Sequence, residues 1–129
     1  MEEKMESYSE NAAAVSFVLQ NYFKGVYTGD IVLLRQVFHP AALVAGDIKG
    51  QPYFKSLAEY LYGVENRKSP FALKETFRME IISIEIINSI AIAKVHLPMF
   101  EFNYYDLLSL TKVGGDWVIV NKLLTHVSV

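Results

Sequence analysis

Cysteine is absent from this sequence, and its absence excludes several kinds of chemistry. Disulfide bonds, thiolate nucleophiles and cysteine-based zinc sites all require that residue. Histidine is scarce, and His39, His96 and His126 are too dispersed to form the helical i, i+4 pair of a common zinc motif. We therefore predict neither a metal site nor a cofactor.

A strong charge of either sign and a long hydrophobic run are also missing. The net charge is −2 at pH 7, so there is no basic excess to neutralise nucleic-acid phosphates. No apolar run reaches the length that spans a bilayer, and the polar, acidic first residues do not resemble a signal peptide. We expect a soluble, cytoplasmic protein that binds neither nucleic acid nor a membrane.

Apolar and aromatic side chains are abundant instead. Hydrophobic residues make up 52% of the chain, which has eight tyrosines, eight phenylalanines and one tryptophan. A chain of 129 residues is long enough for one domain with a sizeable core, so we predict a single domain over residues 1–129 with a frayed start at 1–6. Such a composition indicates a large core, or apolar surface that a ligand or partner covers.

Two hydrophobic periodicities divide the chain. Apolar residues spaced by three and four predict helices in the first half, and Ser7 with Glu10 has the spacing of a helix-capping box. From Glu75 onward the period becomes two, which is typical of half-buried strands. The predicted elements are helices over 7–27, 30–38 and 52–66, and strands over 41–45, 75–87, 90–97 and 103–124 with a central turn. Helices followed by an antiparallel meander predict an α+β fold.

Gly114-Gly115 marks that central turn, because a two-residue hairpin loop needs positive φ. In an uninterrupted ladder, Asp106 then pairs with Leu123 and Leu108 with Asn121. Side chains alternate between the two faces of a strand, so Tyr104, Asp106, Trp117 and Asn121 are expected on one apolar face. Lys122 is expected on the opposite, outer face.

The outer face of strands 75–97 mixes isoleucines with charged side chains. We infer that this face meets a second copy of the chain in a two-fold homodimer. The alternative is that these isoleucines are single apolar residues scattered over the surface.

Three stretches carry a family resemblance: GVYTGDIVLLRQVFHPAALVAG at 25–46, ISIEIINSIAIAKVHL at 82–97 and DLLSLTKVGGDWVIVNK at 106–122. In this order they resemble the nuclear transport factor 2-like superfamily, and within it the bacterial branch named "putative lumazine-binding". SnoaL-like and ketosteroid-isomerase-like proteins are similar. The resemblance implies a cone in which three N-terminal helices pack on a strongly curved, mostly antiparallel sheet. It implies no particular chemistry, since this fold hosts isomerases, dehydratases and non-catalytic binders.

Asp106 is the main candidate for chemistry. The resemblance places its face inside the cone, where desolvation would raise the pKa of a carboxyl group and suit it to act as a general base. The alternative is structural: Asp106 and Asn121 hydrogen-bond each other or nearby backbone groups and hold the sheet, as buried polar groups require.

Each of the other candidates also has a structural alternative. Tyr22 could donate to a developing oxyanion, as the resemblance implies, or pack in the core with its hydroxyl satisfied. His39 could lie near the cavity, as the resemblance implies, or meet the carbonyl groups at a helix C-terminus. Tyr104 and Trp117 could line the cavity or pack, and packing is favoured for Trp117.

These residues predict a small-molecule-binding protein, in which Asp106 and Asn121 orient a flat heterocycle or another apolar ligand. One alternative is an isomerase, dehydratase or cyclase with Asp106 as the base and Tyr22 as the donor. Another is a non-catalytic dimeric interaction module with a filled interior. No specific catalytic motif is present, because Gly-x-Ser-x-Gly and a glycine-rich phosphate loop are both missing.

Overall fold

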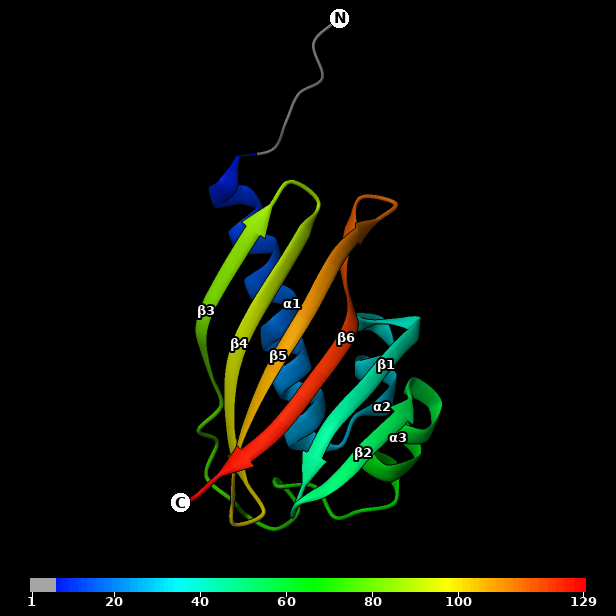
Figure 1. Cartoon of the computed structure of the whole chain (residues 1–129), viewed down its shortest axis with the longest axis vertical. Coiled ribbons are helices and arrows are strands. Elements are labelled where there is room, and N and C mark those ends of the chain that lie inside the picture. The colour runs from blue at the N-terminus through cyan, green and yellow to red at the C-terminus, as the bar shows by residue number, and fades with distance from the viewer. Residues whose placement is uncertain (1–6) are drawn as a thin grey trace, which may run out of the picture.

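A computed structural model describes residues 7–129, so the predicted fraying of residues 1–6 lies outside the described residues. The elements in chain order are α1 (Tyr8–Thr28), α2 (Ile31–Val37), β1 (Phe38–Ile48), β2 (Gln51–Ser56), α3 (Leu57–Glu65), β3 (Glu80–Ile87), β4 (Ile90–Met99), β5 (Phe102–Val113) and β6 (Asp116–Val127). The helices lie on one face of a curved, open sheet, as Figure 1 shows. The predicted α+β fold is confirmed.

The sheet has six strands in the order β2-β1-β6-β5-β4-β3. Every neighbouring pair is antiparallel except β1 and β6, which run parallel. Gly114 and Gly115 have φ values of 59° and 89°, so the turn between β5 and β6 has the conformation that its glycines predicted. Asn88-Ser89 similarly joins β3 to β4, with Ile87 paired to Ile90.

Local capping explains where the helices begin. The Ser7 side chain accepts a hydrogen bond from the Glu10 backbone N–H, and α1 starts at the next residue, as predicted. Asp30 caps α2 in the same way through the Leu33 N–H. Both contacts satisfy backbone donors that the first turn of a helix leaves unpaired.

The segment before α3 differs from the prediction. A helix was expected from Pro52, but residues 51–56 form β2, which pairs with a longer β1 than expected. The helix begins only at Leu57, where Ser56 and Glu59 form a complete capping box. That Ser-x-x-Glu spacing was visible in the sequence and marks the true start of the helix.

A β-bulge between β5 and β6 overturns the predicted register. Leu110 pairs with Ile119, but the next pair is Ser109 with Asn121, so Val120 is the extra residue. Two residues of β6 therefore stand opposite one of β5, and every side chain of β6 beyond the bulge lies on the face opposite to the predicted one. Asn121 turns to the outer face and Lys122 turns toward the helices.

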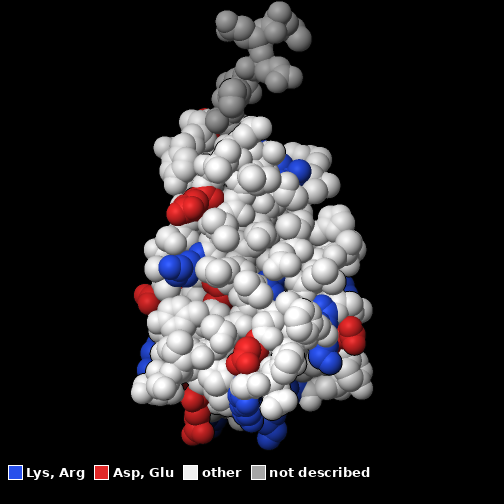
Figure 2. All heavy atoms as spheres, viewed as in Figure 1, with Lys and Arg blue, Asp and Glu red and all other residues white. Residues whose placement is uncertain are grey.

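The core lies between the inner face of the sheet and the helices. Its largest completely buried side chains are Tyr22, Phe23, Phe38, Leu19, Leu34, Leu97, Leu108, Leu110 and Ile119. The outer face is seen in Figure 2, where charged side chains are sparse over the upper and central part of the sheet. Within residues 7–129, no helix combines the length and the hydrophobicity that crossing a membrane requires.

Candidate functional site

Asp106 lies on the inner face of β5, as expected, and only 2% of its surface is exposed. The Tyr22 hydroxyl, which α1 brings across from the helical layer, donates a hydrogen bond of 2.5 Å to Asp106 Oδ2. Tyr22 is itself completely buried. The predicted placement of Asp106 and Asn121 on one face is therefore wrong, because the bulge turns Asn121 to the other face. The alternative of a hydrogen bond between these two side chains is wrong as well, since Tyr22 is the partner of Asp106.

Lys122 is the second buried charge, although it was predicted on the outer face. Its ammonium donates to the Tyr60 hydroxyl oxygen at 2.8 Å and lies 3.9 Å from Asp106 Oδ2. The same nitrogen is 4.4 Å from the centre of the Tyr60 ring and 5.1 Å from that of Tyr22. Aromatic faces attract a cation at such distances, so two tyrosines and one carboxylate surround this ammonium.

A small cavity borders these charges. Its volume is about 40 Å³, and its lining residues are Ile48, Tyr53, Tyr60, Arg67, Leu97, Met99, Tyr104, Asp106, Lys122 and Leu124. Such a space holds one or a few water-sized groups. Tyr53 and Tyr104 are half-buried and Arg67 is exposed, so these three residues mark the side of the cavity that faces solvent.

Burial and the opposite charges set the ionisation of the pair. Burial raises the pKa of the Asp106 carboxyl, and this outweighs the lowering by the Lys122 ammonium and the Tyr22 hydrogen bond. Burial lowers the pKa of Lys122, but Tyr60 and Asp106 together raise it above its ordinary value. Burial also raises the pKa of Tyr22, Tyr53 and Tyr104. The ammonium thus stays charged, while the carboxyl holds its proton to a higher pH than an exposed one.

The remaining sequence candidates are divided between the cavity and other sites. Tyr104 lines the cavity beside Asp106. Trp117 is buried elsewhere and donates its indole N–H to Asn11 Oδ1 at 3.2 Å, which is the packing role favoured for it. His39 accepts the Ala41 N–H at Nδ1 and is absent from the cavity lining.

Sequence reasoning missed Tyr60, Arg67 and Lys122 as site residues. For Tyr60 a signal existed: Leu57, Tyr60, Leu61 and Val64 have helical i, i+3, i+4, i+7 spacing, and all are buried on one face of α3. For Lys122 the signal was weaker, namely a single charge within the apolar strand VIVNKLL. The face on which Lys122 lies depends on the bulge at Val120, and no spacing of residues in the sequence indicates that bulge.

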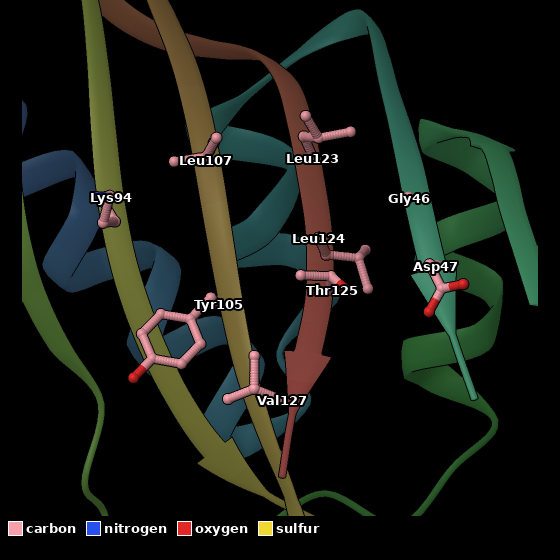
Figure 3. Close-up of a pocket in the computed structure, with 9 residues that line it drawn as sticks. All are labelled: Gly46, Asp47, Lys94, Tyr105, Leu107, Leu123, Leu124, Thr125 and Val127. Carbon is pink, nitrogen blue, oxygen red and sulfur yellow. The ribbon is translucent and has the colours of Figure 1, made fainter. Parts of the chain in front are cut away.

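A second, open groove of about 630 Å³ lies on the outer face of the sheet. Figure 3 shows its lining residues, which come from β1, β4, β5 and β6: Gly46, Asp47, Lys94, Tyr105, Leu107, Leu123, Leu124, Thr125 and Val127. Its walls are largely apolar. This groove and the inner cavity lie on opposite faces of the same sheet.

Within residues 7–129, no group of histidine, aspartate and glutamate side chains is arranged to hold a metal ion. The polar groups that line the inner cavity are the ammonium of Lys122, the carboxyl of Asp106, the guanidinium of Arg67 and the phenols of three tyrosines. Together these groups can bind an acceptor-rich ligand and can exchange a proton with it.

Three helices packed on a curved, mostly antiparallel sheet form the fold of nuclear transport factor 2-like proteins. The chain belongs to the family described as "Putative lumazine-binding", whose model matches residues 10–125. A search of curated proteins found no match.

Solved structures of bacterial proteins share this fold over nearly the whole chain. A nuclear transport factor 2-like protein of unknown function from Silicibacter pomeroyi has a TM-score of 0.86 and 21% identity, covering 95% of this chain and 100% of its own. A similar protein from Shewanella baltica has a TM-score of 0.85 and 22% identity, and the match covers 96% of this chain and 99% of its own. Another, from Methylobacillus flagellatus, has a TM-score of 0.83 and 23% identity, and the match covers 98% of this chain and 100% of its own.

Proposed function

We propose that this protein binds a small organic molecule in the inner cavity, with Lys122 and Asp106 orienting its polar end. The observation that carries the proposal is a buried ion pair with open space in front of it. Lys122 and Asp106 are only 4% and 2% exposed, and both line the cavity. Apolar residues of similar volume often stabilise a fold as well as a buried ion pair does, so such a pair beside a cavity suggests a binding role.

The dimensions of the cavity limit how a ligand enters. About 40 Å³ accommodates only a polar end group, so the rest of a flat heterocycle must lie toward the exposed side. Tyr53, Tyr104 and Arg67 form that side, and their partial exposure leaves room for their side chains to move. Two phenol rings and a guanidinium suit an aromatic ligand, because each can stack on a planar ring. The family description supports a pteridine such as lumazine as the first compound to test.

A direct test is to titrate lumazine into the purified protein and follow its fluorescence, with native mass spectrometry of protein from its own source alongside. We expect saturable binding that is lost when Tyr104→Ala removes one wall. The matched control is Tyr62→Ala, an exposed tyrosine on α3 outside the cavity lining. If neither lumazine nor any co-purified small molecule binds, the proposed function is wrong.

Proton transfer is a second candidate function, and the buried Asp106 carboxyl with its raised pKa favours it. Asp106 would take a proton from the carbon next to a ligand carbonyl, leaving an enolate oxygen near Lys122. The Tyr22 hydroxyl already donates to Asp106, so it orients the base and is not the donor to the ligand. Exchange of pyruvate methyl protons in D₂O, measured by NMR, tests this. An exchange rate equal to that of Asp106→Asn would exclude it.

We also propose that the outer face of the sheet pairs with a second copy of the chain. Ile87, Ile90 and Ile92 are 74%, 54% and 42% exposed and line a shallow hollow of the sheet together with Ser109 and Val120. Leu107 and Leu123 of the open groove are 38% and 46% exposed. Exposed apolar patches of this kind mark interaction sites. Lys94 and Asp47 line the groove with opposite charges, so a two-fold axis that runs along the strands through the groove would bring each near the other residue in the second copy.

Light scattering and analytical ultracentrifugation at micromolar concentration test the homodimer. We expect twice the monomer mass for the natural chain and a monomer for Leu107→Glu. The control is Val32→Glu, which places the same charge at an exposed apolar residue on α2, away from the sheet face. A monomeric natural chain, or a Leu107→Glu dimer, would contradict this interface.

A further inference from the structure

The Lys122 ammonium has fewer acceptors than donors. An ammonium carries three N–H donors, and Lys122 makes one hydrogen bond, to the Tyr60 oxygen at 2.8 Å. Asp106 Oδ2, at 3.9 Å, is too distant for a hydrogen bond. Lys122 lines the cavity, and among the described residues the structure records no second hydrogen-bond acceptor for this nearly buried cation. Buried donors are almost always paired, so an acceptor outside the protein is indicated.

The Tyr60 hydroxyl supplies another donor at the same place. Its oxygen accepts from Lys122, so its own proton points elsewhere. Within the described part of the chain, the structure records no acceptor for that proton. Tyr60 is buried and lines the cavity. Lys122 and Tyr60 together thus present converging donors to a single ligand group.

The charge of the lining favours an anion. Its charged residues are Arg67, Asp106 and Lys122, two cations and one acid. The Asp106 carboxylate would repel a dianion, and a cavity of about 40 Å³ is small for a tetrahedral phosphate or sulfate. A planar carboxylate has two acceptor oxygens and one negative charge, which fits both the space and the donors. The apolar side chains of Leu97, Met99 and Leu124 suit the carbon chain of such a ligand.

We propose that the inner cavity recognises small organic acids, with the ligand carboxylate between the Lys122 ammonium and the Tyr60 hydroxyl. This inference rests on the proposed ligand-binding function and names the class of ligand. Arg67 lies at the exposed side, where it attracts the anion and can pair with a second carboxylate on a longer ligand.

Asp106 makes this binding dependent on pH. Its carboxylate and the ligand carboxylate would both lie near Lys122 and repel each other. Binding therefore favours a protonated Asp106, whose carboxyl also shares its surroundings with Tyr22, Tyr53, Tyr60, Tyr104 and Arg67. Burial already raises the pKa of Asp106, which makes the protonation easier. Affinity should rise as pH falls, down to the pH at which the ligand itself becomes protonated.

The test is a titration of ¹⁵N-labelled protein with sodium acetate and sodium propanoate, followed by amide shifts. Acetamide serves as the neutral isostere of acetate, and sodium sulfate as the second anion. We expect saturable shifts at residues that line the cavity with both carboxylates, and no saturation with acetamide or sulfate. Tyr60→Phe should weaken acetate binding about tenfold, the effect of one hydrogen bond to a charged group. Asp106→Asn should strengthen it at pH 7.

Further variants separate the charge effect from a loss of folding. Lys122→Met could unfold the chain, so the double variant Lys122→Met/Asp106→Asn, which leaves no unpaired charge, should fold and lose acetate binding. Lys24→Met removes an exposed lysine on α1, outside the cavity lining, and should bind acetate normally. Equal binding of acetate and acetamide, or acetate binding by the double variant, would overturn this inference. If lumazine binds and carboxylates do not, the proposed function stands and this inference alone fails.

Discussion

The Lys122 ammonium lies 3.9 Å from Asp106 Oδ2, and both side chains are buried between the sheet and the helices. Removing one partner leaves an uncompensated charge in the core. We predict that Lys122→Met lowers the free energy of unfolding by about 3–5 kcal/mol at pH 7. The loss should be smaller at pH 5, because the Asp106 carboxyl can then take up a proton. Urea denaturation at the two pH values measures both effects.

The double variant Lys122→Met/Asp106→Asn, with the two single variants, completes a double-mutant cycle. With neither charge present, most of the lost stability should return, since the penalty arises from a single unpaired ion. A coupling free energy close to zero between the two substitutions would show that the pair does not interact. All variants must be compared at one protein concentration, because self-association also shifts the apparent stability.

Asp106 should also make stability depend on pH in a defined direction. Its pKa is raised in the folded chain, so above the ordinary pKa of about 4 the folded chain binds more protons than the unfolded one. The stability from this group is fully present below that ordinary value and is lost as the pH rises through the raised one. The free energy of unfolding of the natural chain, minus that of Asp106→Asn, should therefore fall as pH increases from about 4. A difference that stays flat or rises would contradict the raised pKa.

Asparagine is a suitable reference at this position because its side-chain oxygen can still accept the Tyr22 hydrogen bond. Lys122 loses its counter-charge in that variant, while burial still lowers the pKa of this lysine. Comparing Lys122→Met with Lys122→Met/Asp106→Asn, in which no ammonium titrates at this position, therefore checks that the slope with pH reports on Asp106.

Much of the fold could be predicted because its signals are local. The capping residue Ser7 marks the start of α1, and Gly114-Gly115 marks the turn between β5 and β6. Alternation also placed Asp106 on the inner face, since β5 is regular between that residue and Leu108. Each of these inferences needs only a few neighbouring residues.

Residue spacing could not predict the polar partners of Asp106, because they come from distant parts of the chain, although the family resemblance placed Tyr22 in the same site. Tyr22 comes from α1, 84 residues earlier, and Lys122 reaches the inner face only through the bulge at Val120. A bulge adds one residue to a strand without changing the apolar pattern enough to reveal it. The error in register therefore placed Asn121 on the inner face, where the structure has Lys122. For that reason the sequence predicted a neutral amide beside Asp106 and missed the ammonium. Likewise, β2 forms because it pairs with the edge of β1. That partner cannot be recognised from residues 51–56 alone.

The hydrogen bond from Tyr22 to Asp106 should contribute more to stability than one between neutral groups. We predict that Tyr22→Phe lowers the free energy of unfolding by about 1.5–3 kcal/mol, the range for hydrogen bonds to charged groups. Tyr27→Phe is the matched control, because the Tyr27 hydroxyl donates to the neutral Glu75 carbonyl oxygen, also at 2.5 Å. That loss should be about 1 kcal/mol. Equal losses in the two variants would argue against an ionised Asp106.

Gly46 should be the least replaceable glycine in the sheet. It lies in β1 opposite Leu124 of β6, with a φ of 146°. A Cβ atom there would lie 1.8 Å from the Leu124 carbonyl oxygen, so the backbones of β1 and β6 would have to separate. We predict that Gly46→Ala lowers the free energy of unfolding by more than about 4 kcal/mol, in the range reserved for severe packing defects. Gly50→Ala is the control, because its φ of 75° is also positive but no atom lies within 4 Å of the added carbon.

The free energy of unfolding of Gly50→Ala should fall by only about 1–2 kcal/mol, from backbone strain alone. Thermal or urea denaturation of both variants measures the difference, and a Gly46→Ala protein as stable as Gly50→Ala would contradict the close approach of the two strands.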